Sequence, residues 1–157
     1  MLKRMIALAA IVAFSTVAAA QSTTQSGAQT APAKPEAAKS KTMTDAQGVW
    51  VFTIVDGNDM AGQPEIVITI TDNKYVQTID GNVVERGTFK IDETKKPMQL
   101  DLFVGEGQDA GKTQVGVFEI TGGNIMKGKL NTAGETLRPT DFAPADGYFT
   151  FTAAKKK

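Results

Sequence analysis

The sequence contains no cysteine and no histidine. Without a thiol, the chain has no cysteine nucleophile, no disulfide and no cysteine-ligated metal or iron–sulfur cluster. Without an imidazole, it lacks a Ser-His-Asp triad, a histidine general base and histidine-ligated zinc, copper or haem. These two absences exclude most familiar catalytic chemistry for the chain acting alone, and they predict neither a cofactor nor a metal centre.

Positive charge is scarce in the body of the chain. There are 17 basic and 17 acidic side chains in all, but residues 44–154 hold only nine basic side chains against 16 acidic ones, a balance of −7. Nucleic acids and anionic membranes are bound by clustered positive charge, so we expect no nucleic-acid partner. The last three residues, Lys155, Lys156 and Lys157, read as a solvated basic tail or a weak electrostatic tether.

The first twenty residues have the pattern of a secretory signal peptide. Lys3 and Arg4 precede an apolar run, and Ala18 and Ala20 supply the small residues that a signal peptidase accepts. The run is shorter than the roughly 20 residues that a membrane-spanning helix needs. We therefore expect cleavage after Ala20, an exported protein in the periplasm or outside the cell, and no stable membrane insertion after cleavage.

Residues 21–43 contain almost no bulky apolar side chain and are rich in Ala, Ser, Thr, Gln, Pro and Lys. Such a segment buries too little surface to offset the entropy lost on ordering, so we expect a disordered linker. The folded domain is then expected at residues 44–154, with the basic tail at 155–157.

Residues 44–154 are rich in β-branched and aromatic side chains, and turn residues interrupt them at regular spacing. Asp80-Gly81 is the strongest hairpin signal. No segment has a helical period. The expected strands are Gly48–Val55, Glu65–Thr71, Lys74–Ile79, Asn82–Asp92, Met98–Val104, Lys112–Ile120, Asn124–Leu130 and Tyr148–Thr152.

These eight strands are joined mostly by consecutive short turns, which favours an up-and-down meander. An eight-stranded antiparallel meander can close into a barrel whose interior holds side chains or one small ligand. We therefore predict an all-β, eight-stranded antiparallel up-and-down barrel. Alternation along the strands predicts these inward positions: Trp50, Phe52, Ile54, Ile66, Ile68, Ile70, Leu100, Leu102, Phe118, Ile120, Met126, Phe149 and Phe151.

A set of short motifs carries a family resemblance. The motifs are Gly48-Val49-Trp50, Gly87-Thr88-Phe89, the run from Asp92 to Pro97 followed by Leu100-Asp101-Leu102, Gly111-Lys112-Thr113, and Arg138-Pro139-Thr140-Asp141-Phe142. In this order and spacing they resemble the planctomycete-type lipocalin-like domain family of unknown function. The resemblance covers residues 45–154 and implies a lipocalin-like, calycin-type barrel in an exported bacterial protein, with no established activity.

The resemblance also implies roles for two side chains. The tryptophan of the Gly-x-Trp motif, here Trp50, is expected to close the bottom of the barrel beneath a basic side chain, and Arg138 is the expected partner. The chain departs from the family at Lys127 and Lys129, where relatives tend to be more apolar. Because alternation places Met126 with the inward set, we expect both lysines to face outward.

The connection from Asn131 to Asp146 is long for this chain. Long loops are often functional, and this one carries Arg138 and Phe142. Arg138 could bind a ligand carboxylate or phosphate through its planar guanidinium. Alternatively, Arg138 pairs with Asp141 or covers the tryptophan while Phe142 anchors the loop to the barrel.

Acidic residues gather mainly at turns. The segments 56–59 and 105–111 have oxygen ligands at spacings only partly like those of a calcium loop, and turn geometry accounts for their composition. Two carboxylates could hydrolyse a glycoside without histidine. Glu85 and Glu119 are the only acidic side chains that share a face with valines, and we expect them at the rim or outside.

The leading hypothesis is therefore a non-enzymatic carrier of a small hydrophobic ligand, without catalytic residues. Its predicted ligand-binding residues are Trp50, Tyr75, Gln77, Arg138 and Phe142, with Tyr75 and Gln77 as polar contacts near a mouth. The alternative is a barrel filled by its own side chains that recognises an envelope protein or glycan through its loops. An interior cavity distinguishes the two hypotheses, because only the carrier needs one.

Overall fold

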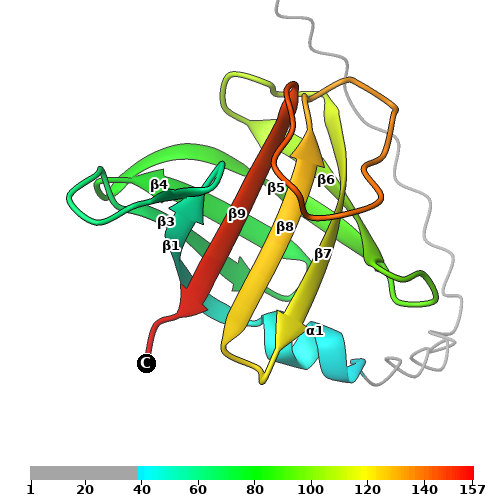
Figure 1. Ribbon diagram of the computed structural model, residues 1–157, viewed down its shortest axis with the longest axis horizontal. Coiled ribbons are helices and arrows are strands. Elements are labelled where there is room, and N and C mark those ends of the chain that lie inside the picture. The colour runs from blue at the N-terminus through cyan, green and yellow to red at the C-terminus, as the bar shows by residue number, and fades with distance from the viewer. Residues whose placement is uncertain (1–38) are drawn as a thin grey trace, which may run out of the picture. The chain divides into compact units, whose positions relative to one another are not determined.

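The computed structural model describes residues 39–157. The expected signal peptide, and the expected linker up to residue 38, lie outside the described residues. Within them, strands and one short helix form an all-β domain (Figure 1). Residues 39–157 include no helix with the length and apolarity that crossing a membrane requires.

The helix, α1, spans Lys41–Ala46. The strands are β1 (Gly48–Val55), β2 (Asn58–Asp59), β3 (Ile66–Thr71), β4 (Lys74–Ile79), β5 (Asn82–Asp92), β6 (Met98–Glu106), β7 (Thr113–Thr121), β8 (Ile125–Asn131) and β9 (Tyr148–Lys155). Apart from the two-residue β2, these are the eight strands expected from the sequence.

The sheet closes on itself. Neighbouring strands pair antiparallel in the order β2-β1-β3-β4-β5-β6-β7-β8-β9, and β1 pairs with β9 as well as with β3. Strand β2 only extends the end of β1. The protein is therefore a closed eight-stranded antiparallel up-and-down barrel, which confirms the predicted fold class. Closure also leaves the eight long strands without an unpaired edge along the barrel.

The turn at Asp80-Gly81 shows why the meander could be read from the sequence. Both residues have a left-handed backbone, with φ of 48° and 78°. A two-residue type I′ hairpin requires positive φ at both central positions, and aspartate followed by glycine adopts it readily. The hairpin joins β4 to β5 with Ile79 opposite Asn82.

One predicted inward position is wrong. Ile54 is 41% exposed, whereas Val55 packs against the core. The cause is a shift of register in the β1–β9 pairing: Phe52 lies opposite Ala153 and Ile54 lies opposite the preceding residue, so Thr53 is an extra residue. Such a bulge reverses the alternation beyond it.

Helix α1 was not expected, and it spans the predicted boundary between the linker and the domain at residues 43 and 44. Six residues are too few to show a helical period, so the pattern that identifies longer helices is absent. The Ser40 side chain caps the helix by accepting a hydrogen bond from the Met43 amide. Met43 packs against the barrel core and Ala46 is buried. The folded domain therefore begins before residue 44.

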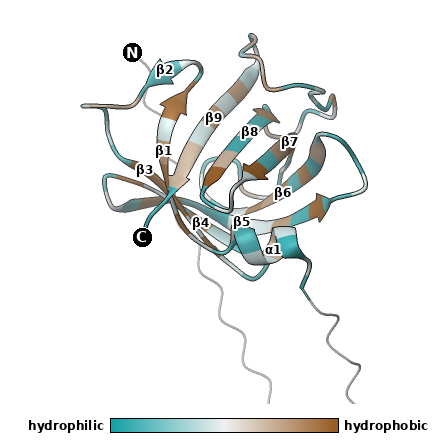
Figure 2. Ribbon diagram, turned by 60° about the horizontal axis from the view of Figure 1, so that its bottom comes forward, coloured by the Kyte–Doolittle hydropathy of each residue, from teal (hydrophilic) through white to brown (hydrophobic). Residues whose placement is uncertain are grey.

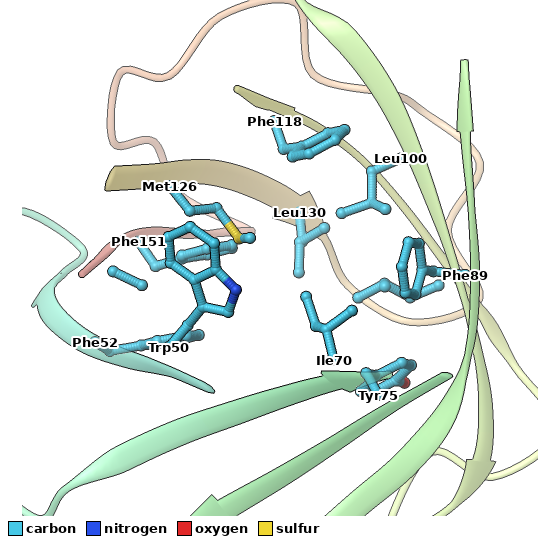
Figure 3. Packing of buried hydrophobic residues seen from close by; sticks show 12 residues of the cluster. Trp50, Phe52, Ile70, Tyr75, Phe89, Leu100, Phe118, Met126, Leu130 and Phe151 are labelled. Atoms are coloured by element: carbon cyan, nitrogen blue, oxygen red, sulfur yellow. The ribbon is translucent and has the colours of Figure 1, made fainter. Parts of the chain in front are cut away.

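The core lies inside the barrel. Hydrophobic and hydrophilic residues alternate along the strands (Figure 2), and the inward side chains of opposite walls converge (Figure 3). Phe52 stacks on Phe151 with ring centroids 4.7 Å apart and an interplanar angle of 2°. The buried cluster is Trp50, Phe52, Ile70, Tyr75, Phe89, Leu100, Leu102, Phe118, Met126, Leu130, Phe151 and Ala153.

Candidate functional site

The interior of the barrel is not filled. A cavity of about 320 Å³ lies between the inner faces of the strands. Most of its wall is aliphatic or aromatic, with Phe52, Phe118 and Phe151 among the lining side chains. Its polar lining residues are Tyr75, Gln77, Glu85 and Gln114. The volume is at the lower end of the roughly 300–1,000 Å³ typical of small-molecule pockets, which suits a compact ligand.

Trp50 and α1 close one end of the barrel. Trp50 is fully buried, and its indole Nε1–H donates a 2.8 Å hydrogen bond to the carbonyl oxygen of Ala46 at the end of α1. Ala46 itself lines the cavity. Beside it, the Gln47 side chain donates to the carbonyl oxygen of Asp72 at 3.1 Å, and Thr42 donates to the Glu93 carboxylate at 3.1 Å. The helix and the residue after it thus contact two turns, β3–β4 and β5–β6, at the end of the barrel that Trp50 closes.

The basic side chain over the tryptophan is Lys155, not Arg138. The Lys155 ammonium nitrogen lies 5.2 Å from the ring centroid of Trp50 and donates a 2.9 Å hydrogen bond to the carbonyl oxygen of Asp45. Lys155 also pairs with Trp50 in the β1–β9 ladder. Lys155 is therefore part of the closed end, and the expectation that it belongs to a solvated tail is wrong.

The opposite end of the cavity is accessible. Strand β5 ends next to Glu93, which α1 contacts, so Glu85 near the start of β5 lies away from the helix. Gln77 and Gln114 are half-buried, as is Glu85, whereas Trp50 is fully buried. Gln114 likewise lies near the start of β7, whose other end reaches Gly123 beside Asp45 of α1, so polar and partly exposed lining residues lie away from the helix. We call this end, lined by Gln77, Glu85 and Gln114, the mouth.

A hydrogen-bonded pair joins the apolar interior to the mouth. The Tyr75 hydroxyl donates to Oε1 of Glu85 at 2.7 Å. Tyr75 is 1% exposed, and this burial, together with the hydrogen bond to Glu85 and its negative charge, raises the pKa of Tyr75 above its usual value. The phenol is therefore a fixed donor that orients the Glu85 carboxylate.

Gly87 makes room for this pair. A Cβ atom at this position would stand 2.8 Å from Cε1 of Tyr75 and 2.1 Å from the carbonyl oxygen of Phe103. The β5–β6 register shifts between Arg86 and Gly87, which confirms the bulge or bend expected there. Because the backbone approaches so closely, any larger residue would displace the Tyr75 ring.

Glu85 lines the cavity at the mouth, which agrees with the expected rim position and not with the outer one. Its place could have been found from alternation, because positions 85, 87, 89 and 91 share one face of β5 and Phe89 and Ile91 also line the cavity. Glu85 stands opposite Gln77 in the β4–β5 ladder. No lysine or arginine is among the described residues that line the cavity.

The long connection packs on the outer wall instead of entering the mouth. The Arg138 guanidinium donates to the carbonyl oxygens of Leu100 at 2.8 Å and Gly116 at 2.6 Å, and it pairs with Asp101. In Figure 1 this segment, drawn in orange between β8 and β9, crosses the outside of the barrel. Arg138 pairs neither with Asp141 nor with Trp50, contrary to both structural expectations for it.

Lys129 is the second anchor of this connection. It faces outward, as expected, yet its side chain is only 6% exposed because the connection covers it. Its ammonium nitrogen donates to Asp141 at 2.9 Å and lies 4.9 Å from the ring centroid of Tyr148. The hydrogen bond from Lys129, and one from the Ala143 amide, hold the pKa of the Asp141 carboxyl below its usual value.

The predicted binding residues therefore separate into three places. Tyr75 and Gln77 line the cavity, Trp50 lies at its closed end, and Arg138 and Phe142 belong to the outer connection. Phe142 is half-buried. Tyr75 is far more buried than a residue expected near the mouth. Two cavity residues that the sequence analysis missed, Glu85 and Gln114, could have been found only by extending the strand alternation to polar side chains.

Oxygen-rich turns serve the fold. The carboxylate of Asp56 accepts hydrogen bonds from the amide and hydroxyl of Thr150, at 2.8 Å and 3.2 Å, and so joins the β1 turn to β9. Across residues 39–157, no three acidic side chains gather in a way that would hold a metal ion. No protein-family model matches the sequence, and no curated protein matches it either.

Proposed function

We propose that this protein is an exported, non-enzymatic, lipocalin-like carrier that binds a small and mainly apolar ligand inside its barrel. The cavity carries the proposal, since a filled barrel would leave a ligand no space. Its apolar wall and few polar groups match the usual composition of small-molecule sites. The closed barrel also supports membership of the planctomycete-type lipocalin-like family, and export rests on the pattern of the first twenty residues.

The lining of the cavity favours binding over catalysis. Glycoside hydrolysis by carboxylates needs two acidic side chains across the scissile bond. Glu85 is the one acidic side chain among the described residues that line this cavity, and its Oε1 already accepts the Tyr75 hydrogen bond. A single carboxylate held by a phenol can bind and orient a ligand without taking part in a reaction.

The interaction-module hypothesis is supported less well. It assigns Arg138 and Phe142 to a contact with an envelope protein or glycan. The Arg138 guanidinium is engaged by two backbone carbonyls and by Asp101, so a partner would have to compete with all three. A polar group that already has hydrogen-bond partners within the fold gains little binding free energy by exchanging them for a new partner.

The test is a native mass spectrum of the full chain produced in its own host. We expect a reproducible excess mass that is lost on denaturation. The variant Ile68→Trp adds a larger ring to the cavity wall and should lose the excess mass. Val67→Trp is the matched control, because the neighbouring side chain points to the other face of β3 and should keep it.

A neutral fluorescent probe, N-phenyl-1-naphthylamine, extends the test to ligands that are lost in purification. Binding that Ile68→Trp removes and Val67→Trp keeps supports the carrier. A bare polypeptide mass together with no probe binding by the folded wild-type chain would overturn the carrier proposal in favour of the filled-barrel module. Circular dichroism of each variant shows whether it has folded.

A further inference from the structure

The polar part of the cavity has a definite chemical character. Three half-buried side chains of the lining can accept a hydrogen bond: Gln77 and Glu85, which face each other in the β4–β5 ladder, and Gln114 on β7. Glu85 is the only charged one. Since Tyr75 occupies Oε1, the other carboxylate oxygen, Oε2, accepts no hydrogen bond from the rest of the described chain. The side-chain amides of Gln77 and Gln114 likewise make no hydrogen bond within residues 39–157.

This inference rests on the proposed carrier function and concerns the head group of its ligand. We propose that the ligand carries a cationic amine at one end of a compact apolar body, and that Glu85 binds the amine at the mouth. An ammonium group has three donors and no acceptor, which suits a carboxylate oxygen beside the amide oxygen of Gln77, the residue opposite Glu85 in the β4–β5 ladder. Tyr75 holds the carboxylate in place from the apolar side and is a positioning residue.

Electrostatics exclude the opposite head group. A fatty acid or another anion would place its charge beside Glu85, with no lysine or arginine of the described lining to offset the repulsion. Charges interact strongly where water is partly excluded, so an unpaired anion there is unfavourable. The acidic balance of −7 over residues 44–154 also attracts cations to the domain.

The size of the cavity limits the apolar body. At about 320 Å³, the cavity has room for one short chain or a small ring system and not for a two-chain lipid. Aromatic side chains from several strands line it, so the body is held by contact with flat, rigid surfaces. The ligand class is thus a small hydrophobic amine.

Three probes with one octyl chain and different head groups test the inference. We expect the full chain at physiological salt to bind octylamine about tenfold or more tightly than octanol or octanoate, as judged by calorimetry. A charge-assisted hydrogen bond to a carboxylate is stronger than a neutral one, and its loss amounts to roughly ten- to a hundredfold in affinity. The amine is protonated at neutral pH, as lysine is.

The decisive variant is Glu85→Gln, which keeps the shape and removes the charge. It should weaken octylamine binding about ten- to a hundredfold and leave octanol binding unchanged. Glu106→Gln is the matched control: Glu106 is also on the barrel, but it is exposed and pairs with Arg86 outside the cavity. It removes the same charge and should leave all three affinities unchanged.

The possible results separate the two proposals. Octanol or octanoate binding as tightly as octylamine, or an unchanged octylamine affinity in folded Glu85→Gln, would overturn the amine inference while leaving the carrier intact. If Glu85→Gln does not fold, Tyr75→Phe is tested in its place. A preference for octylamine over octanol and octanoate that is the same in Tyr75→Phe as in the wild type would overturn the inference. Failure of all three probes and of the neutral fluorescent probe to bind would overturn both.

Discussion

At the scale of single residues, Trp50 connects the helix to the barrel. Its indole is buried beneath Lys155 and donates to the Ala46 carbonyl, so one side chain fills the closed end and holds α1. The expectation that a tryptophan closes the bottom of the barrel came from the resemblance that the Gly-x-Trp motif carries. Naming its cationic neighbour did not, because the β1–β9 register that brings Lys155 to it joins residues from opposite ends of the domain.

We predict that Trp50→Phe lowers the free energy of unfolding by about 1–3 kcal/mol. The variant loses the indole hydrogen bond, leaves the Ala46 carbonyl without its donor, and buries less apolar surface. Urea denaturation of the full chain measures the change. Phe103→Leu is the control, because Phe103 is exposed and its replacement should stay within about 0.5 kcal/mol. Equal losses in both variants would contradict the role given to Trp50.

Tyr75 makes the stability of the folded protein fall at alkaline pH. Burial, then the hydrogen bond and charge of Glu85, raise the pKa of Tyr75 in the folded state, while the unfolded chain releases the same proton near pH 10. The folded state then binds more protons than the unfolded state, so stability is complete below about pH 10 and falls as the pH rises further.

We expect Tyr75 to stay protonated in the folded protein above about pH 10. The increase of tyrosinate absorbance with pH should therefore be the same for the folded wild type and the folded Tyr75→Phe variant. When the chain is unfolded in denaturant at the same pH, Tyr75 becomes ionised. The tyrosinate absorbance should then increase further in the wild type and not in Tyr75→Phe. Titration of Tyr75 in the folded protein at the ordinary tyrosine pKa would contradict the burial argument.

At the scale of elements, alternation and turn residues were sufficient for the strands and for an up-and-down meander. Asp80-Gly81, for example, permits a tight turn on local backbone grounds alone. The bulge at Thr53 and the helix at Lys41–Ala46 could not be read this way. Each is stabilised by contacts with distant segments: Thr53 donates to the carbonyl oxygen of Thr152, and Met43 packs on the barrel core.

The connection between β8 and β9 depends on Arg138. We predict that Arg138→Gln lowers the free energy of unfolding by about 1–3 kcal/mol, because charge-assisted hydrogen bonds to two carbonyls and Asp101 are lost. Amide hydrogen exchange should increase within residues 132–147 and change little in β3–β5. Lys127→Gln is the control, since Lys127 is half-exposed and its nearest carboxylate oxygen, on Glu119, is 3.9 Å away.

The same connection gives the protein an acid-sensitive contact. Because Lys129 lowers the pKa of Asp141 in the folded state, this pair contributes stability above the unfolded-state pKa of about 3.9. The contribution is lost as the pH falls below that value and through the lowered folded-state pKa. We expect Asp141→Asn to be less stable than the wild type at neutral pH, with the difference narrowing in acid, as thermal melts across this range will show.

At the scale of the whole molecule, the cavity links ligand binding to stability. A ligand at a free concentration about one hundred times its Kd should raise the free energy of unfolding by about 2.7 kcal/mol if it binds only the folded state. With octylamine as the ligand, the gain should be present in Val67→Trp and absent from Ile68→Trp. A gain in both variants would place the ligand outside the cavity.

The cavity itself was beyond sequence analysis. The list of inward side chains omitted β5, where Phe89 and Ile91 line the cavity, and it suggested crowding, since many of its members are large. Whether such side chains fill a barrel depends on their rotamers and on the close approaches allowed by small residues. Gly116 and Gly128 are inward positions without side chains, where an added Cβ would meet Leu130 at 2.4 Å and Phe151 at 2.3 Å. Such spacing appears only in three dimensions.

The position of α1 also determines which end of the barrel would face an anchor joined to the domain. The helix lies under the closed end, and the chain leaves β9 at the same end, where the Lys156 amide donates to the carbonyl oxygen of Val49. An anchor joined to either side of the domain would therefore hold it by its base. The mouth would then face away from the anchor, so attachment at residue 39 or at residue 157 leaves it uncovered.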